Sequence, residues 1–422
     1  MTEVSSLTPY QSRCYFNCIG YYNAYVRKTI KPLQNFIGLT HLVFGMEQIY
    51  STLSAMTSKE YTVQPMRFPE DGNKVILEYT MVNYTRLDLI TKTYVVDFEP
   101  KSVEECPIKH THEFDSDKAE YPAPEITMKP VAMCRDPFRL GKHKIVLCEP
   151  LYADQRNKDI AFNTRKKCKE ILEKVKEQEP WFGIEQEFYI TDKNDIPLDW
   201  SIHEPSIDIN SEMTVGDHVG FERHFVDLHL RACIYAGLEM YGSVREILPS
   251  EWEFQVGPLP GIQTADQLIL ARYILVRLAE IHNVKISFRN IDCARDTNAR
   301  QALHLNFSTK KTRAEDGIKS IYEIIANISK YPQEALFRHY DLSHGEEMKW
   351  YLDSGFYVAS YHKFKHTIGE KHKSSIRIPR HVANEGKGYI EERRPVSSAD
   401  PYDVCRVFTY AALFDHNGEP LL

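Results

Sequence analysis

The stretch WFGIEQEFYI, residues 181–190, decides how the fold of this chain is interpreted. Its aromatic and branched residues, without an internal proline, are typical of a β-strand. Side chains alternate between the two faces of a strand, so Glu185 and Glu187 share one face while Phe182 and Phe188 lie on the other. Two carboxylates this close repel each other, and burying them without compensation is costly. The stretch therefore raises the question of what neutralises its charged face.

The same alternation of polar and apolar residues recurs in three later stretches, SEWEFQ, HLNFS and GYIEERRP. A single strand of this kind usually has one face in the core and the other in water. Several in one domain can instead line a common cavity, and periodicity leaves both interpretations open. Carboxylates with one imidazole suit Mg²⁺ or Mn²⁺, ions that also bridge the phosphate oxygens of triphosphate substrates. The side chains that would converge are Glu185, Glu187, Glu246, Glu253, His304 and Glu391.

The composition is that of an ordinary soluble globular protein, with 422 residues, 42% hydrophobic and 26% charged residues, and a net charge of −7. This charge argues against a general nucleic-acid-binding surface. Nine cysteines without a CxxC pair favour free thiols in a reducing compartment, so we expect the cytosol, with a mitochondrial address as the alternative. The apolar segment 36–56 is interrupted by His41 and Glu47, which favours a packed or interfacial helix over a membrane span. We expect neither a nucleic-acid nor a membrane partner.

The hydrophobic periodicity predicts an α+β chain with a small N-terminal sheet and a large mixed domain. Residues 74–98 have the pattern of two or three strands, and a proline-dotted stretch follows at 99–150. A threonine, Thr264, gives an N-cap signal for the most strongly periodic helix. The predicted helices are 162–178, 224–237, 264–283, 315–330 and 400–414, and further short strands are predicted at 252–257, 304–309 and 374–380.

Five stretches in this order and spacing resemble eukaryotic-type glutamine synthetase: PWFGIEQEF, EILPSEWEFQVGP, HLNFSTK, SIRIPR and GYIEERRP. The resemblance runs from residue 45 to the C-terminus and leaves 1–44 as a family-atypical extension. It implies a β-grasp-like domain over 45–150 and, over 151–422, a catalytic-type domain with a curved antiparallel sheet and flanking helices. It also implies ATP-dependent ligation of glutamate and ammonia, in a homo-oligomeric ring such as a double pentamer. The partners would be further copies of this chain or a related glutamine synthetase subunit.

All the metal positions of the family, and part of its nucleotide site, have matching residues here. The resemblance implies that Glu187, Glu246 and Glu253 hold one Mg²⁺ or Mn²⁺ ion. It implies that Glu185, His304 and Glu391 hold the other. The implied ATP-binding residues are Trp181, Asn306, Ser308, Arg313, Arg377, Tyr389 and Arg393, of which Arg393 is also a candidate for stabilising phosphate charge.

The glutamate and ammonium positions depart from the family in four separate loops. These loops lack the residues that the family uses to bind glutamate, deprotonate ammonium and close the site. The loops are CPIKHTHEFDSD, NARQALH, LDSGFYVAS and the segment before SIRIPR. A glycine that permits close backbone approach is among the residues replaced. The residues at the altered positions are His112, Arg300, Ala302, Leu352, Tyr357, Val358 and His372.

Three interpretations follow from this mixture of kept and altered positions. The first is a structural or regulatory ring protein that keeps metal and part of the ATP site but has lost the standard reaction, or nearly so. The second is an ATP-dependent ligase acting on another acid or amine. The third is an ordinary glutamine synthetase whose flap residues align differently, with His344 or Lys349 in register.

Overall fold

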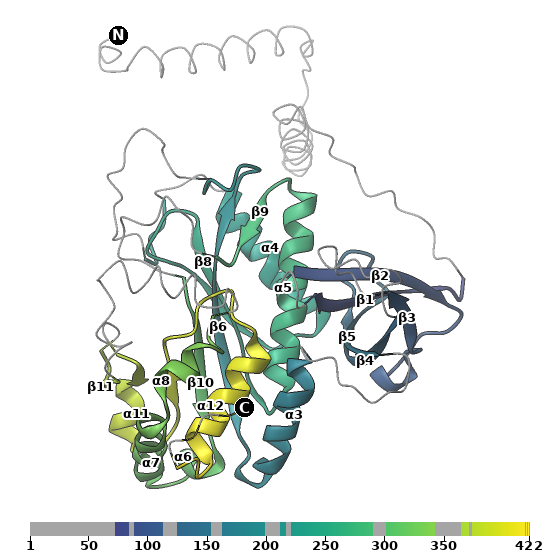
Figure 1. The fold of residues 1–422 in the computed structure, drawn as a ribbon. Coiled ribbons are helices and arrows are strands. Elements are labelled where there is room, and N and C mark those ends of the chain that lie inside the picture. Colours follow the sequence, from purple (N-terminus) through teal and green to yellow (C-terminus); the bar gives the residue numbers. More distant parts are fainter. Residues whose placement is uncertain are drawn as a thin grey trace, which may run out of the picture. The chain divides into compact units, whose positions relative to one another are not determined.

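The computed structural model describes residues 72–83, 88–112, 125–152, 163–198, 212–216, 221–289, 301–341, 364–370, 374–417, 419 and 421 (Figure 1). The chain divides into two compact units, Met1–Asp71 and Gly72–Leu422, and the described residues all belong to the second. The helix predicted at 36–56 lies outside them. The domain boundaries expected at 44/45 and 150/151 stay predictions.

A five-stranded sheet forms the first part of the described chain, with strand order β2-β1-β5-β4-β3. Strands β1 and β5 are parallel, and the other neighbours are antiparallel. The apolar residues of β1 alternate along the strand and join one buried cluster (Val75, Leu77, Tyr79 and Met81), which gives the sheet an apolar face, while Glu78 and Thr80 on the other face are buried too. The strands are β1 (Val75–Asn83), β2 (Asp88–Val96), β3 (Lys109–His112), β4 (Glu125–Arg135) and β5 (Lys144–Tyr152), with a 3₁₀ turn at Val103–Glu105.

The two strands expected within 74–98 are confirmed as β1 and β2. The proline-dotted stretch after them holds three further strands that proline made hard to predict. Pro130 lies in β4 at a register shift against β5, between Pro130 and Ala132. Proline is tolerated at such a bulge because no ladder hydrogen bond from its nitrogen is needed there.

The rest of the described chain contains an eight-stranded sheet. Seven of its strands follow the order β11-β12-β13-β10-β6-β8-β7, and the eighth, β9, pairs with β6. Its pairs are antiparallel except β11 with β12. The long strands β6 (Trp181–Thr191) and β8 (Glu251–Pro260) lie next to each other within it. The others are β7 (Met240–Arg245), β9 (Lys285–Ser287), β10 (Leu303–Ser308), β11 (His366–Ile368), β12 (Ile376–Ile378) and β13 (Ile390–Glu392).

Helices pack on the apolar face of this larger sheet. Phe307 of β10 contacts Phe408 of α12 with ring centroids 5.2 Å apart, and α5 packs on β6 and β8. All five predicted helices are present. The helices are α3 (Thr164–Lys174), α4 (Phe221–Ala236), α5 (Gln263–Ile281), α6 (Lys310–Arg313), α7 (Gly317–Lys330), α8 (Gln333–Phe337), α11 (Arg380–Glu385) and α12 (Pro401–Leu413), with a 3₁₀ turn at Lys176–Gln178. The α+β prediction is confirmed.

The predicted N-cap role of Thr264 is wrong. Helix α5 begins at Gln263, and its N-cap residue, Ile262, makes no side-chain capping bond. The Thr264 hydroxyl donates instead to the carbonyl oxygen of Phe182 at 2.9 Å, which ties the first turn of α5 to strand β6. A tertiary acceptor therefore competes successfully with the local cap.

Among the described residues, six cysteines are buried free thiols: Cys106, Cys134, Cys148, Cys168, Cys233 and Cys405. None of the helices in the described ranges combines the length and the apolar character needed to cross a membrane.

Candidate metal and nucleotide site

The polar faces of the central strands meet in register on the larger sheet. Glu185 of β6 lies opposite His304 of β10 on one side and Gln255 of β8 on the other. Two residues further along, Glu187 lies opposite Glu253. Directly opposed residues on adjacent strands have neighbouring side chains, so the carboxylates expected from the alternation gather on one surface. The other face of β6 is buried in the core, as the sequence predicts.

Two sets of side chains in the described part of the chain could hold a metal ion, and they share one residue. In each set the ligand atoms lie within 4.8 Å of one another. One set is Glu187, Glu246 and Glu253, and the second is Glu185, Glu253 and His304. The imidazole Nδ1 of His304 lies 3.2 Å from a carboxylate oxygen of Glu185 and 4.0 Å from one of Glu187. Glu253 thus stands between the two candidate ion positions.

The electrostatics of these groups fit a divalent cation. Burial, followed by the charges of Glu246 and its neighbours, raises the pKa of Glu187 well above its usual range. Burial and the nearby Glu185 raise the pKa of Glu253 in the same way. Carboxylates crowded together with raised pKa values would be neutralised by Mg²⁺ or Mn²⁺, which prefer oxygen ligands. The donor set therefore fits the metals that the resemblance implies.

Glu185 and His304 form a hydrogen-bonded pair within this arrangement. Burial opposes ionisation of Glu185, but the hydrogen bond and the charge of His304 lower its pKa to about 2. Burial and then the Arg393 guanidinium lower the pKa of His304, which favours the neutral imidazole that metals bind. The Nδ2 amide of Asn306 also donates to Glu185, over 2.9 Å.

Glu391 lies at the edge of the cluster in contact with two arginines. Its fully buried carboxylate accepts hydrogen bonds from Arg377 and Arg393 and lies 3.7 Å from Nδ1 of His304. Burial opposes the charge of Arg393, but Glu391 and then Glu185 raise its pKa. The structure brings Glu391 close to its expected partners, although Glu253 completes the closely spaced set with Glu185 and His304.

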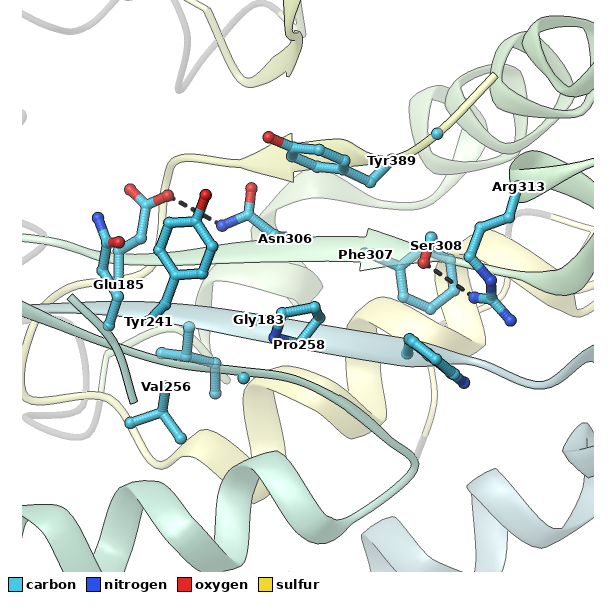
Figure 2. Close-up of a pocket in the computed structure, with 15 residues that line it drawn as sticks. Gly183, Glu185, Tyr241, Val256, Pro258, Asn306, Phe307, Ser308, Arg313 and Tyr389 are labelled. Atoms are coloured by element: carbon cyan, nitrogen blue, oxygen red, sulfur yellow. Dashed lines mark hydrogen bonds between the residues drawn. The ribbon is translucent and has the colours of Figure 1, made fainter. Parts of the chain in front are cut away.

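A cavity of about 400 Å³ opens beside the carboxylates (Figure 2). Glu185 lies at one end of it, and Arg313 lies at the other (Figure 2). The Arg313 guanidinium carbon stands 4.6 Å from the Trp181 ring centroid, and Arg313 donates to Ser308 Oγ over 2.9 Å. Of the expected nucleotide residues, Trp181, Asn306, Ser308, Arg313 and Tyr389 line the cavity, and Arg377 and Arg393 lie at Glu391 instead. The volume suits a nucleotide-sized ligand.

The cavity floor depends on irregular backbone in β8. The register between β6 and β8 shifts between Phe182 and Ile184, where Gly257 and Pro258 of β8 line the cavity. Gly257 has a φ of +94°, and a Cβ there would lie 2.8 Å from the carbonyl oxygen of Phe182. Only glycine fits this position without moving a central strand.

Sequence reasoning missed three residues of this region as site components. Tyr241 and Gln255 line the cavity, and Glu251 is buried next to the carboxylate groups. Burial and the charge of Glu246 raise the pKa of Glu251 to about 8. The face shared by Glu251, Glu253 and Gln255 was the available signal for two of them. Nothing in the sequence around Tyr241 marks it.

The positions that depart from the glutamine synthetase pattern are described only in part. Ala302 is buried, and its backbone N–H donates to Oε2 of Glu187 at 2.6 Å. His112 is the last residue of β3 and pairs with Glu125 of β4. The structure therefore places Ala302 directly beside a candidate metal ligand, at a position where the resemblance expects a glycine. Outside the described residues lie Arg300, Leu352, Tyr357, Val358 and His372.

Fold and site together define an α+β protein with a carboxylate-rich surface on a large, mainly antiparallel sheet. Glutamine synthetase of Gallus gallus is 35% identical over 370 residues, covering 87% of this chain and 98% of the relative. Glutamine synthetase of Panulirus argus is 37% identical, over 77% and 89%. "Glutamine synthetase 1, mitochondrial" of Drosophila melanogaster is 36% identical, over 82% and 85%. The chain belongs to the glutamine synthetase family.

The comparison of folds agrees with the comparison of sequences. A solved structure described as "Apo GmaS without ligand" superposes with a TM-score of 0.60 at 12% identity, over 81% of this chain and 77% of that one. At this identity the similarity establishes the fold alone. No family model matches the chain.

Proposed function

We propose that this protein binds Mg²⁺ or Mn²⁺ and ATP on the polar face of the larger sheet, and that its ligation of glutamate to ammonia is lost or very weak. The observation that carries the proposal is Glu185, which belongs to one carboxylate set and also lines the cavity. One side chain thereby links the metal position to the nucleotide position. A nucleotide in the cavity would have its phosphates at the carboxylate end, where a divalent ion neutralises phosphate charge.

The altered substrate positions support loss of the standard reaction. The resemblance expects an arginine for the glutamate carboxylate where this chain has Leu352, and a glutamate that closes the site where it has Val358. His112 occupies the place of the aspartate expected at the ammonium site. Without these groups the chain lacks the expected base for ammonium and a charge partner worth roughly 2–5 kcal/mol in a desolvated pair.

Arg377 and Arg393 are the chain's own candidates for contacting phosphate. Both guanidinium groups are held at Glu391, within the same cluster as the candidate metal ligands. A guanidinium group pairs with phosphate oxygens in a planar, bidentate geometry. We expect both arginines to bind nucleotide phosphate, in keeping with a site that retains this half of the family's machinery.

The remaining role is that of a structural or regulatory ring protein, assembled from copies of this chain or with a related glutamine synthetase subunit. Ring assembly is what the family resemblance implies for its members. The buried free thiols fit a reducing compartment such as the cytosol. The mitochondrial alternative receives support only from the name of the Drosophila relative.

Calorimetry and an activity assay on the purified full chain test this proposal. We expect Mg·ATP or Mn·ATP to bind, and γ-glutamyl hydroxamate formation from glutamate, hydroxylamine and ATP to stay at background. Robust turnover would exclude the loss of function, and absence of nucleotide binding would exclude the retained ATP site. The double variant Leu352→Arg, Val358→Glu tests whether the flap residues are the missing part. No gain of activity would direct attention to the other altered loops.

A second candidate is an ATP-dependent ligase that joins a different acid or amine. The observation that favours it is that five of the six candidate ligands gather in two closely spaced sets beside a formed cavity, which a purely structural protein does not need. A screen of amines and carboxylic acids for ADP release would identify such a substrate. Good ATP binding without any substrate-dependent ADP release would count against it.

A further inference from the structure

The connection between β7 and β8 carries Glu246, which belongs to the first candidate ligand set together with Glu187 and Glu253. Glu187 and Glu253 are directly opposed in the ladder of β6 and β8, whereas β7 ends at Arg245, directly before Glu246. The second set lies entirely on strands β6, β8 and β10. Strand pairing therefore fixes the backbone of every other ligand in the two sets, and Glu246 needs a different support.

Hydrogen bonds to Glu251 fold this connection into a tight turn. The Glu246 N–H donates to the carbonyl oxygen of Glu251 over 2.9 Å, and the Glu251 N–H donates to that of Leu248 over 3.1 Å. The Leu248 N–H donates to Oε2 of Glu251, also over 3.1 Å. The position of Glu246 therefore follows from the position of Glu251.

Ser250, directly before Glu251, has a backbone conformation that must be imposed by its surroundings. Its φ is +61°, in the left-handed region that residues with a side chain rarely adopt. Such a conformation persists only where neighbouring contacts determine it. The Ile190 N–H of β6 makes one such contact, because it donates to the Ser250 carbonyl oxygen over 3.0 Å.

Glu222, in the first turn of α4, makes a further contact with this turn. Its Oε1 accepts a hydrogen bond from the Ser250 hydroxyl, and its Oε2 accepts one from Nε1 of Trp252 over 3.1 Å. The Glu222 side chain is only 2% exposed, and burying a carboxylate is unfavourable unless it is hydrogen-bonded. Ser250 and Trp252 flank Glu251 in the chain. One carboxylate thus holds the backbone on both sides of the residue that organises the turn.

We propose that Glu222 is a positioning residue for Glu246, and through Glu246 for the metal ion of the first set. The inference rests on the proposed metal site and adds a residue to it. Side chains alternate along β8, so Glu222 holds the side of the strand that faces away from Glu253 and acts through the turn rather than as a ligand. Without its carboxylate the turn would shift Glu246, whereas the second set would stay in place on its paired strands.

Calorimetric titration of the purified full chain with Mn²⁺ tests this assignment. Wild type is expected to bind two ions per chain, one at each set. Glu222→Leu is expected to raise the Kd of one ion about tenfold and to leave the Kd of the other within about twofold of wild type. Ser250→Ala, a smaller change that removes only the hydroxyl, is expected to raise the Kd of the same ion about threefold. It keeps the test valid where Glu222→Leu does not fold.

A conservative variant and a control separate the hydrogen bonds from a general disturbance of α4. Glu222→Gln is expected to bind both ions like wild type, because an amide can donate to the Ser250 hydroxyl oxygen and accept from Trp252 Nε1. Asp227→Leu is the matched control, since Asp227 is an exposed acidic residue of the same helix. It is expected to leave the affinity for both ions unchanged.

A double-mutant cycle with Glu246→Gln shows whether Glu222 acts through Glu246. In the Glu246→Gln background, adding Glu222→Leu is expected to change Mn²⁺ binding less than about twofold, because substitutions that act on the same contact are not additive. Fully additive losses would overturn the proposed route through Glu246.

The remaining outcomes distinguish this inference from the metal site on which it rests. Unchanged Mn²⁺ binding in Ser250→Ala and in a folded Glu222→Leu would overturn the inference and leave the metal site standing. Equal weakening of both ions would also overturn it, because it would indicate a general disturbance of the sheet. Binding by Glu222→Gln as weak as that of Glu222→Leu would exclude the hydrogen bonds as the cause. A wild-type chain that binds fewer than two ions would remove the two-ion site and this inference together.

Discussion

Arg272 donates from its Nε to the side-chain oxygen of Gln186 over 2.8 Å, across the core between helix α5 and strand β6. Gln186 is the residue between Glu185 and Glu187, and its Nε2 donates to Ser397 Oγ over 2.7 Å. The Ser397 hydroxyl in turn donates to the carbonyl oxygen of Glu187. The two neighbouring carboxylates are therefore positioned from behind by a buried polar network.

We expect Arg272→Leu to lower the free energy of unfolding by about 2–4 kcal/mol, because Gln186 and two backbone carbonyls would lose their buried donor. Burial lowers the pKa of Arg272 to about 10, so the charge is itself costly to bury. Removing the buried charge saves that cost, but we expect the loss of the hydrogen bonds to Gln186 and the two carbonyls to be larger. Urea unfolding measures the change.

Arg277→Leu is the control for this prediction. Arg277 lies on the same helix but is partly exposed, and it forms an ion pair with Glu280 in the last turn of α5. Exposed pairs of this kind contribute about 0–1 kcal/mol. Equal effects of the two substitutions would show that the network behind β6 contributes little.

The shared position of Glu253 predicts that one substitution weakens metal binding at both candidate sites. Mn²⁺ at one hundred times its Kd stabilises a protein by about 2.7 kcal/mol when it binds only the folded state. We expect Glu253→Gln to retain less than half of that stabilisation, because Glu253 belongs to both sets. Thermal melting with Mn²⁺ and with EDTA makes the comparison. Glu170→Gln, at an exposed residue of α3, serves as the control, and an undiminished Mn²⁺ effect in Glu253→Gln would refute the shared role.

The fold class and the polar faces could be predicted because they depend on local alternation. Glu185 and Glu187 share a face whatever strand pairs with β6, and the same holds for Glu251 and Glu253 on β8. Which carboxylates come within ligand distance depends on strand register and rotamers, and neither is encoded by spacing. The resemblance groups Glu391 with Glu185 and His304; the structure keeps Glu391 3.7 Å from Nδ1 of His304 and bonded to two arginines, but it is Glu253 that joins the set in which all ligand atoms lie within 4.8 Å.

Backbone irregularities account for the rest of what sequence reasoning missed. The register of β7 against β8 shifts at Tyr241, a residue that lines the cavity, and no residue type marks this bulge. Thr264 has the residue type of a cap, but the nearby carbonyl of Phe182 takes its hydroxyl. In both cases the deciding partner is far away in the sequence.

Metal affinity is expected to rise with pH across the neutral range. Burial, with neighbouring carboxylates, raises the pKa values of Glu187 and Glu253, and that of Glu251 to about 8. A raised pKa means that the metal-free site holds protons that a metal must displace. Calorimetric titration with Mn²⁺ at pH 6, 7 and 8, in buffers of different ionisation enthalpy, should show tighter binding and proton release. A pH-independent Kd without proton release would contradict these protonation states.

Two buried groups outside the site predict opposite pH dependences that nearly cancel. Burial lowers the pKa of His229 to about 4 from 6.5, so the unfolded chain binds more protons between these values and stability falls as the pH falls. Burial, with the charge of Asp403, raises the pKa of Asp400 to about 6 from 3.8, so the folded chain binds more protons and stability rises as the pH falls. Each contribution is about 3 kcal/mol over its full range.

Single substitutions should separate the two contributions between pH 6 and pH 4. Asp400→Asn removes the compensating group, so its free energy of unfolding is expected to fall more steeply than that of wild type as the pH is lowered. His229→Gln removes the other group, so its free energy of unfolding is expected to fall less steeply than wild type, or to rise. Urea unfolding at half-unit pH steps measures both slopes relative to wild type. If the free energy of unfolding changed with pH by the same slope in all three proteins, the shifted pKa values of His229 and Asp400 would be contradicted.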